Sequence, residues 1–321
     1  MNGLAKISLL LVIVLVSLSA YLRLAHSGIG CADWPACYGQ IGEPPSVSQP
    51  VSPQDAYQRM GEEANQPMAW ATPLHRLVAS VLGLLVFFLV ILSLRQKRQR
   101  LISLTLLALT IFLAVLGIRS GSLHSPAVVM GNLAGGFAML GLLGWMVFSA
   151  ADPGPGARRN TAVKNLVIVA IATLSLQILL GGLTSANFAA TSCRTLPDCH
   201  GGWLPGSALM DAMDLSRQHE VTGMGQAIGG DERIAIHKAH RLGALLTFAM
   251  VLIAAITALR ADQRYRLSGI IILVLLTIEF TVGVTAVLSS LPIGLAVAHN
   301  WLAGLLLLAL LWTGRLSIPD R

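Results

Sequence analysis

The chain has 321 residues, of which 55% are hydrophobic and only 12% charged, and its mean hydropathy is +0.71. Soluble globular domains carry roughly 25% charged residues, so this composition excludes a water-soluble enzyme. It also excludes a disordered chain, which requires low hydrophobicity. The net charge of +7 alone would be compatible with nucleic-acid binding, but the basic residues flank apolar segments, so we expect no nucleic-acid partner. The composition predicts an integral membrane protein.

Eight apolar stretches are long enough to cross a bilayer core of about 30 Å, which needs roughly 20 residues per helix. They cover residues 5–24, 74–94, 101–118, 126–150, 165–186, 236–259, 267–288 and 294–314. The first stretch, with Lys6 at its start, also fits a cleaved signal peptide. We favour an uncleaved helix, because cleavage would leave seven spans and break the repeat described below. The sequence therefore predicts an all-α integral membrane protein with eight transmembrane helices.

Charge is distributed unevenly between the two sides of these spans. Thirteen of the 22 Lys and Arg residues lie near the chain ends or in the connections that follow spans two, four and six. The two long loops, 25–73 and 187–235, hold 11 of the 15 acidic residues. The positive-inside rule therefore predicts that both termini are cytoplasmic and that both long loops lie outside. We expect a multi-pass protein of the cell inner membrane.

The sequence contains an internal duplication with an offset of 162 to 167 residues. Three pairs of matching features carry it: two cysteines six residues apart, a His-Arg-Leu start of a span, and an Asn or His followed by a Trp 13 residues later. The first-half members are Cys31 and Cys37, His75-Arg76-Leu77, and Asn132 with Trp145, and the second-half members are Cys193 and Cys199, His240-Arg241-Leu242, and His299 with Trp312. The repeat predicts two pseudo-symmetric four-helix bundles, residues 1–150 and 151–321, with sites between facing helices.

Two histidines lie a few residues inside the outer ends of spans six and eight, His240 and His299. Ionisable residues within spans usually have a function, and two imidazoles on facing helices can hold a haem iron between them. His237 lies one turn before His240 and is the alternative ligand. The repeat favours His240, because it aligns with His75 whereas His237 aligns with Thr72.

Other polar groups accompany these histidines. Arg241 and Arg76 follow His240 and His75 directly, and a guanidinium at the interface suits a haem propionate; the alternative is that each reaches toward lipid headgroups. Glu279 in span seven and Gln177 in span five are interpreted as helix-packing hydrogen-bonding groups.

Four cysteines allow three disulfide pairings. Proximity and the repeat favour Cys31–Cys37 and Cys193–Cys199, in loops that face an oxidising compartment. A zinc site is the competing interpretation, although the sequence has no CxxC pair.

Together these motifs resemble the haem A synthase family, whose members make haem A from haem O in the membrane. The resemblance rests on the segment 23–40, the His-Arg starts of spans two and six, the segment 236–241, the second cysteine pair and His299, so it covers all eight spans. It implies a haem b between His240 and His299 in the second half. It also implies that the first half binds the substrate haem O and oxidises its C8 methyl group to a formyl group by two successive hydroxylations, with loss of water from the gem-diol. Haem O synthase and an electron donor that the sequence does not identify are the implied partners.

Two positions of the first half depart from the family pattern. Thr72 stands where the family has Glu, and Asn132 stands where it has a second His. His75 is then the axial imidazole and catalytic residue that remains in the first half, with Glu62, Glu63 or His124 as substitutes for the missing groups. Three hypotheses follow: a haem A synthase with a divergent substrate pocket, a non-catalytic haem-binding paralogue in haem delivery or oxidase assembly, and a membrane electron-transfer cytochrome.

Overall fold

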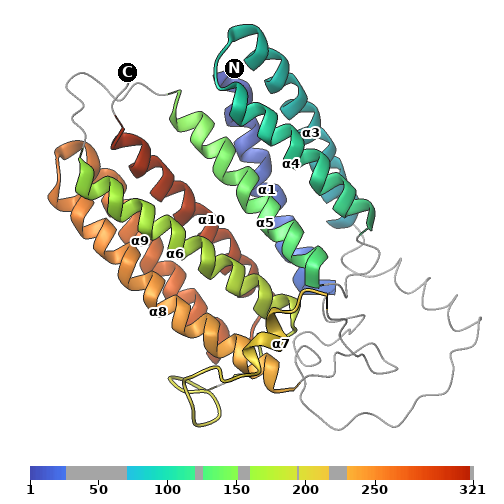
Figure 1. The fold of residues 1–321 in the computed structure, drawn as a ribbon, viewed down its shortest axis with the longest axis vertical. Coiled ribbons are helices and arrows are strands. Elements are labelled where there is room, and N and C mark those ends of the chain that lie inside the picture. The colour runs from blue at the N-terminus through green and yellow to red at the C-terminus, as the bar shows by residue number, and fades with distance from the viewer. Residues whose placement is uncertain (27–70, 120–125, 151–159, 194, 217–229, 319–321) are drawn as a thin grey trace, which may run out of the picture.

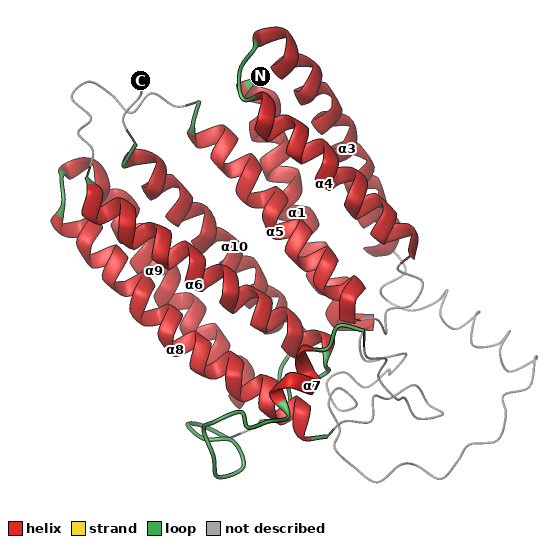
Figure 2. Cartoon of the chain, in the orientation of Figure 1, coloured by secondary structure: helices red, strands yellow, loops and turns green. Residues whose placement is uncertain are grey.

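The structure is a computed structural model that describes the chain except residues 27–70, 120–125, 151–159, 194, 217–229 and 319–321. The regular elements in the described residues are α-helices (Figure 2). They are α1 (Asn2–His26), α3 (Ala71–Gln96), α4 (Arg100–Arg119), α5 (Pro126–Phe148), α6 (Thr161–Ala186), α7 (Leu209–Met213), α8 (Asp231–Arg260), α9 (Gln263–Leu288) and α10 (Ile293–Leu316).

The eight predicted spans are confirmed, because eight of these helices are long and apolar enough to cross a membrane. The protein is therefore a multi-pass membrane protein. The boundaries predicted for the second long loop are wrong at one end, since α8 begins at Asp231 rather than at residue 236. Asp231 and Glu232 occupy its first turn, where negative charge stabilises the helix N-terminus, and hydropathy does not detect such a turn. The short helix α7 lies within the same loop.

The helices of each half contact one another in a closed ring. In the first half α1 contacts α3 and α5, and α4 contacts the same two helices. In the second half α6 contacts α8 and α10, and α9 contacts the same two. Contacts of α10 with α1 and α5, and of α5 with α6, join the halves (Figure 1). The helices that carry His240 and His299, α8 and α10, thus lie diagonally across one ring, as do α3 and α5 in the other.

Glycines allow the helices of the two halves to approach closely. A Cβ atom on Gly182 of α6 would lie 2.8 Å from Leu133 Cδ2 of α5, and one on Gly304 of α10 would lie 3.1 Å from Leu140 Cδ2 of the same helix. Lipid tails are as apolar as the helices, so the hydrophobic effect does not drive helices together in a membrane. They associate instead through small residues, which let the backbones pack closely. The glycines thereby bring α5 against the second half, next to the cavity described below.

The two ends of the helices differ in charge. The start of α1 and the end of α10 lie at one end of the molecule, and α7 lies at the other (Figure 1). The end with the chain termini also carries the basic connections between α3 and α4 and between α8 and α9, with Arg95, Lys97, Arg98, Arg260 and Arg264. The predicted orientation rests on this difference in charge between the two ends of the helices, and it stays a prediction.

Candidate functional site

A cavity of about 470 Å³ lies inside the ring of the second half. Its walls come from α6, α8, α9 and α10, and α1 and α5 of the first half add Arg23, Leu133 and Phe137. Leu196 and Trp203 of the loop after α6 line it as well. Cavities of about 300–1,000 Å³ with apolar walls and few polar groups are typical ligand sites. The polar groups of this cavity therefore indicate what it binds.

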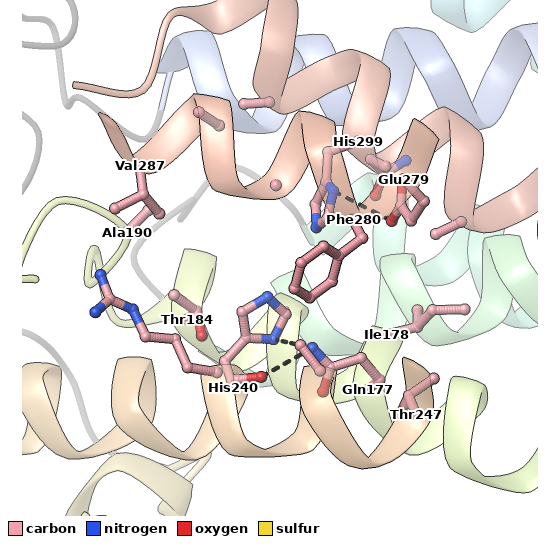
Figure 3. A pocket seen from close by; sticks show the side chains of 18 of the residues that line it. Gln177, Ile178, Thr184, Ala190, His240, Thr247, Glu279, Phe280, Val287 and His299 are labelled. Carbon is pink, nitrogen blue, oxygen red and sulfur yellow. Dashed lines mark hydrogen bonds and ion pairs between the residues drawn. The ribbon is translucent and has the colours of Figure 1, made fainter. Parts of the chain in front are cut away.

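His240 of α8 and His299 of α10 face each other across this cavity (Figure 3). Their ring centres are 6.4 Å apart, and the ring planes are nearly perpendicular, at 87°. A metal atom midway would lie about 3.2 Å from each centre, half of that separation. This distance matches a metal–imidazole bond of about 2.0–2.1 Å, as zinc sites show, plus the distance from the ring nitrogen to the ring centre. The two imidazoles thus fit a haem iron held between them.

Each of these rings lies against a glycine of the neighbouring helix. A Cβ atom on Gly181 of α6 would lie 3.1 Å from His240 Cε1, and one on Gly283 of α9 would lie 3.0 Å from His299 Cε1. Any larger residue at these positions would displace the imidazole. The glycines therefore provide the space in which each ring lies.

Each imidazole also has a polar partner on the same neighbouring helix. Glu279 Oε1 lies 3.2 Å from His299 Nδ1. Gln177 Nε2 lies 3.0 Å from His240 Nδ1 and donates to the His240 carbonyl at 2.9 Å. Gln177 and Glu279 do bridge neighbouring helices, as interpreted from the sequence, but the sequence did not reveal that their partners are the two facing histidines. The one available signal was that both lie in spans, four residues before a glycine.

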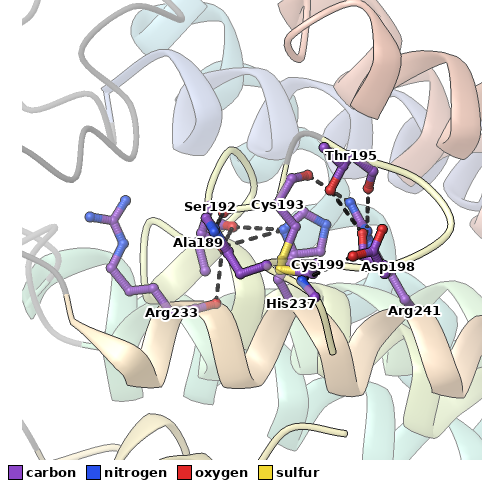
Figure 4. The surroundings of a disulfide bond; sticks show 11 residues. Ala189, Ser192, Cys193, Thr195, Asp198, Cys199, Arg233, His237 and Arg241 are labelled. Carbon is purple, nitrogen blue, oxygen red and sulfur yellow. Dashed lines mark hydrogen bonds between the residues drawn. A yellow bond between two sulfur atoms is a disulfide. The ribbon is translucent and has the colours of Figure 1, made fainter. Parts of the chain in front are cut away.

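His237, the alternative ligand, lies outside this pair. It is buried, and its Nδ1 lies 3.0 Å from the Ala189 carbonyl and 3.4 Å from Ser192 Oγ (Figure 4). His237 lines the cavity near the loop after α6, whereas His240 is the residue of α8 whose ring faces His299. The ligand role of His240, which the repeat favours, stays a prediction.

The loop after α6 is closed by a disulfide between Cys193 and Cys199 (Figure 4). The pairing predicted for these two cysteines is confirmed, and it excludes them as free thiolate ligands of zinc. Cys31 and Cys37 lie outside the described residues. In the described part of the chain, no group of three or more His, Cys, Asp or Glu residues is arranged to hold a metal ion by itself.

Arg241 binds this disulfide loop. Its Nη1 donates to the carbonyls of Thr195 at 2.7 Å and Asp198 at 3.1 Å, and its Nη2 donates to the Cys193 carbonyl at 2.6 Å. The side chain also lines the cavity. The interaction of Arg241 with a haem propionate stays a prediction, and the structure adds a second role, in which the residue after His240 fixes the loop that borders the cavity.

The predicted residues of the first half lie elsewhere. His75 is half-buried near the start of α3, Arg76 beside it is exposed, and Asn132 is half-buried on α5. Among the described residues that line the cavity of the second half, none of these three occurs. Glu62, Glu63 and His124 lie outside the described residues. The structure thus brings His240, His299 and Arg241 to one cavity and keeps His75 and Arg76 apart from it.

Two facing imidazoles in a cavity among eight helices that are long and apolar enough to cross a membrane fit the class of membrane haem proteins. The chain is a member of the COX15-CtaA family, described as cytochrome oxidase assembly protein, whose pattern matches residues 3–311. Similar proteins are named heme A synthase. That of Shewanella oneidensis is 34% identical over 97% of this chain and 94% of its own length. Those of Neorickettsia sennetsu and Rhizobium meliloti are each 27% identical, over 94% and 89% of this chain and 94% and 81% of their own lengths.

Proposed function

We propose that this protein is a haem A synthase that oxidises the C8 methyl group of haem O to a formyl group. Each of two hydroxylations replaces one C–H bond by C–OH with dioxygen as the oxidant: one oxygen atom enters the product, and the other is reduced to water by two electrons from the donor and two protons. The resulting gem-diol loses water to give the aldehyde. The observation that carries the proposal is the pair of facing histidines in a chain whose full-length relatives bear this name.

In this proposal His240 and His299 would hold a resident haem b through their imidazoles. This group, when bound, would supply one-electron transfer. The chain orients the two rings through α8 and α10, and the apolar cavity walls exclude water from between them. Arg241, at the edge of the cavity, is placed to bind a propionate.

Residues 1–150 form the substrate half and residues 151–321 the haem b half. His75 on α3 is the proposed axial ligand of the haem O iron, and Arg76 beside it binds a propionate of the substrate. Asn132 on α5 lies at the place of His299 in the repeat. An amide is a weak iron ligand, so the sixth position of the substrate iron stays open in this half. An open position suits exchange of substrate for product better than a closed pair does.

We further propose that the protein lies in the cell inner membrane with both termini in the cytoplasm and with the disulfide loop outside. Haem O synthase is the proposed source of the substrate, and a separate electron donor serves the reaction. The separation of basic connections from acidic loops supports this orientation.

A non-catalytic haem-binding paralogue in haem delivery or oxidase assembly is the second candidate. Thr72 and Asn132 support it, since the first half lacks the carboxylate and the second imidazole of the family pattern. A membrane electron-transfer cytochrome requires only the second half.

One experiment separates these functions. The protein is expressed with and without a haem O source, and the haems extracted from membranes are identified by chromatography and mass spectrometry. Haem A or its hydroxylated intermediate, appearing only when this chain and haem O are both present, identifies the enzyme. Haem B as the sole haem bound to the purified protein, with haem O left unconverted, identifies one of the two non-catalytic functions.

A further inference from the structure

The geometry points to Glu279 as a positioning residue that fixes His299 as an iron ligand and lowers the reduction potential of the bound haem. This inference rests on the proposed haem b site. It assigns unequal roles to the two proposed ligands, because His299 contacts a carboxylate and His240 contacts a neutral amide. We propose that this inequality sets the potential of the site.

The position of Glu279 is unusual for a carboxylate. It lies well inside α9, which is long and apolar enough to span the membrane, and its side chain is only 13% exposed. Oε1 contacts His299 Nδ1 at 3.2 Å, and Oε2 is buried without a hydrogen bond to any described residue. A carboxylate inside the membrane is costly and needs a partner of positive charge. A ferric haem has a net positive core, and its ligand His299 is the group that Glu279 contacts.

The contact also defines which ring nitrogen of His299 is available. The 3.2 Å contact with a carboxylate favours the tautomer of His299 that carries its proton on Nδ1, which leaves Nε2 unprotonated. Histidines that bind metals usually donate the other N–H in this way, and the bond fixes the ring and increases its basicity. A more basic imidazole stabilises ferric over ferrous iron, and the nearby negative charge acts in the same direction. Both effects lower the reduction potential.

His240 has a partner at the corresponding place, but this partner is an uncharged hydrogen-bond donor, the amide nitrogen of Gln177, which lies 3.0 Å from Nδ1. Gln177 stands four residues before Gly181 on α6, as Glu279 stands four residues before Gly283 on α9, so each helix presents a polar side chain and a glycine to one imidazole. The amide of Gln177 also donates to the His240 carbonyl at 2.9 Å, so it holds the backbone of α8 as well as the ring. Gln177 therefore orients its histidine with little effect on the charge of the site.

The internal repeat supports a specific link between Glu279 and His299. Gly117 aligns with Gly283 at an offset of 166 residues, within the range of the other matches, so Leu113 occupies the place of Glu279. The first half thus has Leu113 in place of Glu279 and Asn132 in place of His299. The carboxylate occurs in the half that has the second imidazole, as expected if it serves that ligand and not the packing of the helix.

The test is a redox titration of the full-length protein, purified from membranes with its haem, and of its Glu279→Gln variant. The variant keeps the size of the side chain and removes the charge. We expect it to retain haem b with a low-spin spectrum and to shift the ferric–ferrous equilibrium at a given potential by about tenfold toward ferrous, an upward shift of about 59 mV in midpoint potential. Gln177→Glu, which adds a carboxylate beside His240, is expected to shift the midpoint downward. Thr277→Val, which changes an exposed residue of α9 whose hydroxyl bonds to its own helix, is the matched control and leaves the midpoint in place.

The outcomes separate this inference from the proposed function. A wild-type protein without low-spin haem b overturns the proposed site and the inference together. Low-spin haem b with the same midpoint in wild type and Glu279→Gln overturns the inference alone. If Glu279→Gln does not retain haem, the retention of haem is compared in Glu279→Asp and Glu279→Asn instead. These two side chains are equal in size and differ in charge. Retention in the Asp variant alone supports the inference, and equal behaviour of the two overturns it.

Discussion

The two halves of the molecule have the same ring of four helices and different groups at corresponding places. In the second half His240 and His299 face each other at 6.4 Å between ring centres, and each has a polar partner and a glycine on the helix beside it. In the first half His75 remains, while Asn132 takes the place of His299. The comparison teaches that the repeated fold can keep one of the two histidines of a facing pair while the other position changes to a different polar residue.

The environment of one aligned glycine shows the same difference. A Cβ atom on Gly283 would lie 3.0 Å from His299 Cε1, whereas one on Gly117, at an exposed position of α4, would meet none of the described residues within 4 Å. The second half is therefore packed around an imidazole at this place, whereas the aligned glycine of the first half lies at an exposed position of α4.

The largest expected effect is the loss of the haem site of the second half. Replacing His240 or His299 by Ala removes one axial ligand, so we expect complete loss of the bis-imidazole low-spin absorption and electron paramagnetic resonance signals. His237→Ala is the matched control, since His237 lies one turn away on α8 and bonds to the Ala189 carbonyl, and it keeps the low-spin signals. Retention of wild-type signals by both His240→Ala and His299→Ala would show that the ligands were assigned wrongly.

The next effect concerns the substrate half. We expect His75→Ala to reduce the haem A and hydroxylated intermediate extracted from cells to background, while the low-spin haem b of the second half stays. Restoring the family residues by Thr72→Glu and Asn132→His, alone and together, is expected to change the yield of product without changing that spectrum. If His75→Ala leaves both the product and the binding of haem O unchanged, the first half is not a working site and the paralogue hypothesis replaces the enzyme.

Much of the fold and part of the site were predictable from the sequence because their signals are local. The length of each apolar stretch defines a span, and the repeated His-Arg pairs point to His240. The cysteine spacing was sufficient for the pair 193–199.

The missed features depend on contacts between helices. The sequence alone does not show that Glu279 contacts His299 or that Gln177 contacts His240, because each contact depends on the rotation of two helices. The binding of Arg241 to loop carbonyls depends on the conformation of a loop without a regular pattern. The early start of α8 at Asp231 was missed because its first turn is polar.

A smaller effect is expected at the aligned glycines. Gly283→Ala places a methyl group against His299 and forces the ring to shift, and overpacking of this kind costs about 1–3 kcal/mol. We expect weaker retention of haem b and an altered low-spin spectrum. Gly117→Ala, at an exposed position of α4, is expected to leave the haem b spectrum and the thermal stability unchanged. Equal effects of the two substitutions would contradict the difference in packing between the halves.

The smallest effect distinguishes the two arginines that follow the histidines. Arg241 donates to three carbonyls of the disulfide loop, whereas Arg76 is exposed on α3. Because a hydrogen bond contributes about 0.5–1.5 kcal/mol net, Arg241→Gln is expected to lower the thermal stability of the haem b site by about that amount and to increase proteolysis of the loop. Arg76→Gln is expected to leave both unchanged, so the effect of Arg241 comes from the loop and not from the general loss of a cation near the membrane surface. The variant Arg241→Lys separates the charge from the hydrogen bonds. Lysine keeps the positive charge, but its single ammonium group cannot donate to the three carbonyls as the planar guanidinium of arginine does. If the lysine variant behaves as wild type, charge at the cavity edge rather than the loop contact is what Arg241 provides, and its role is then that of a propionate partner.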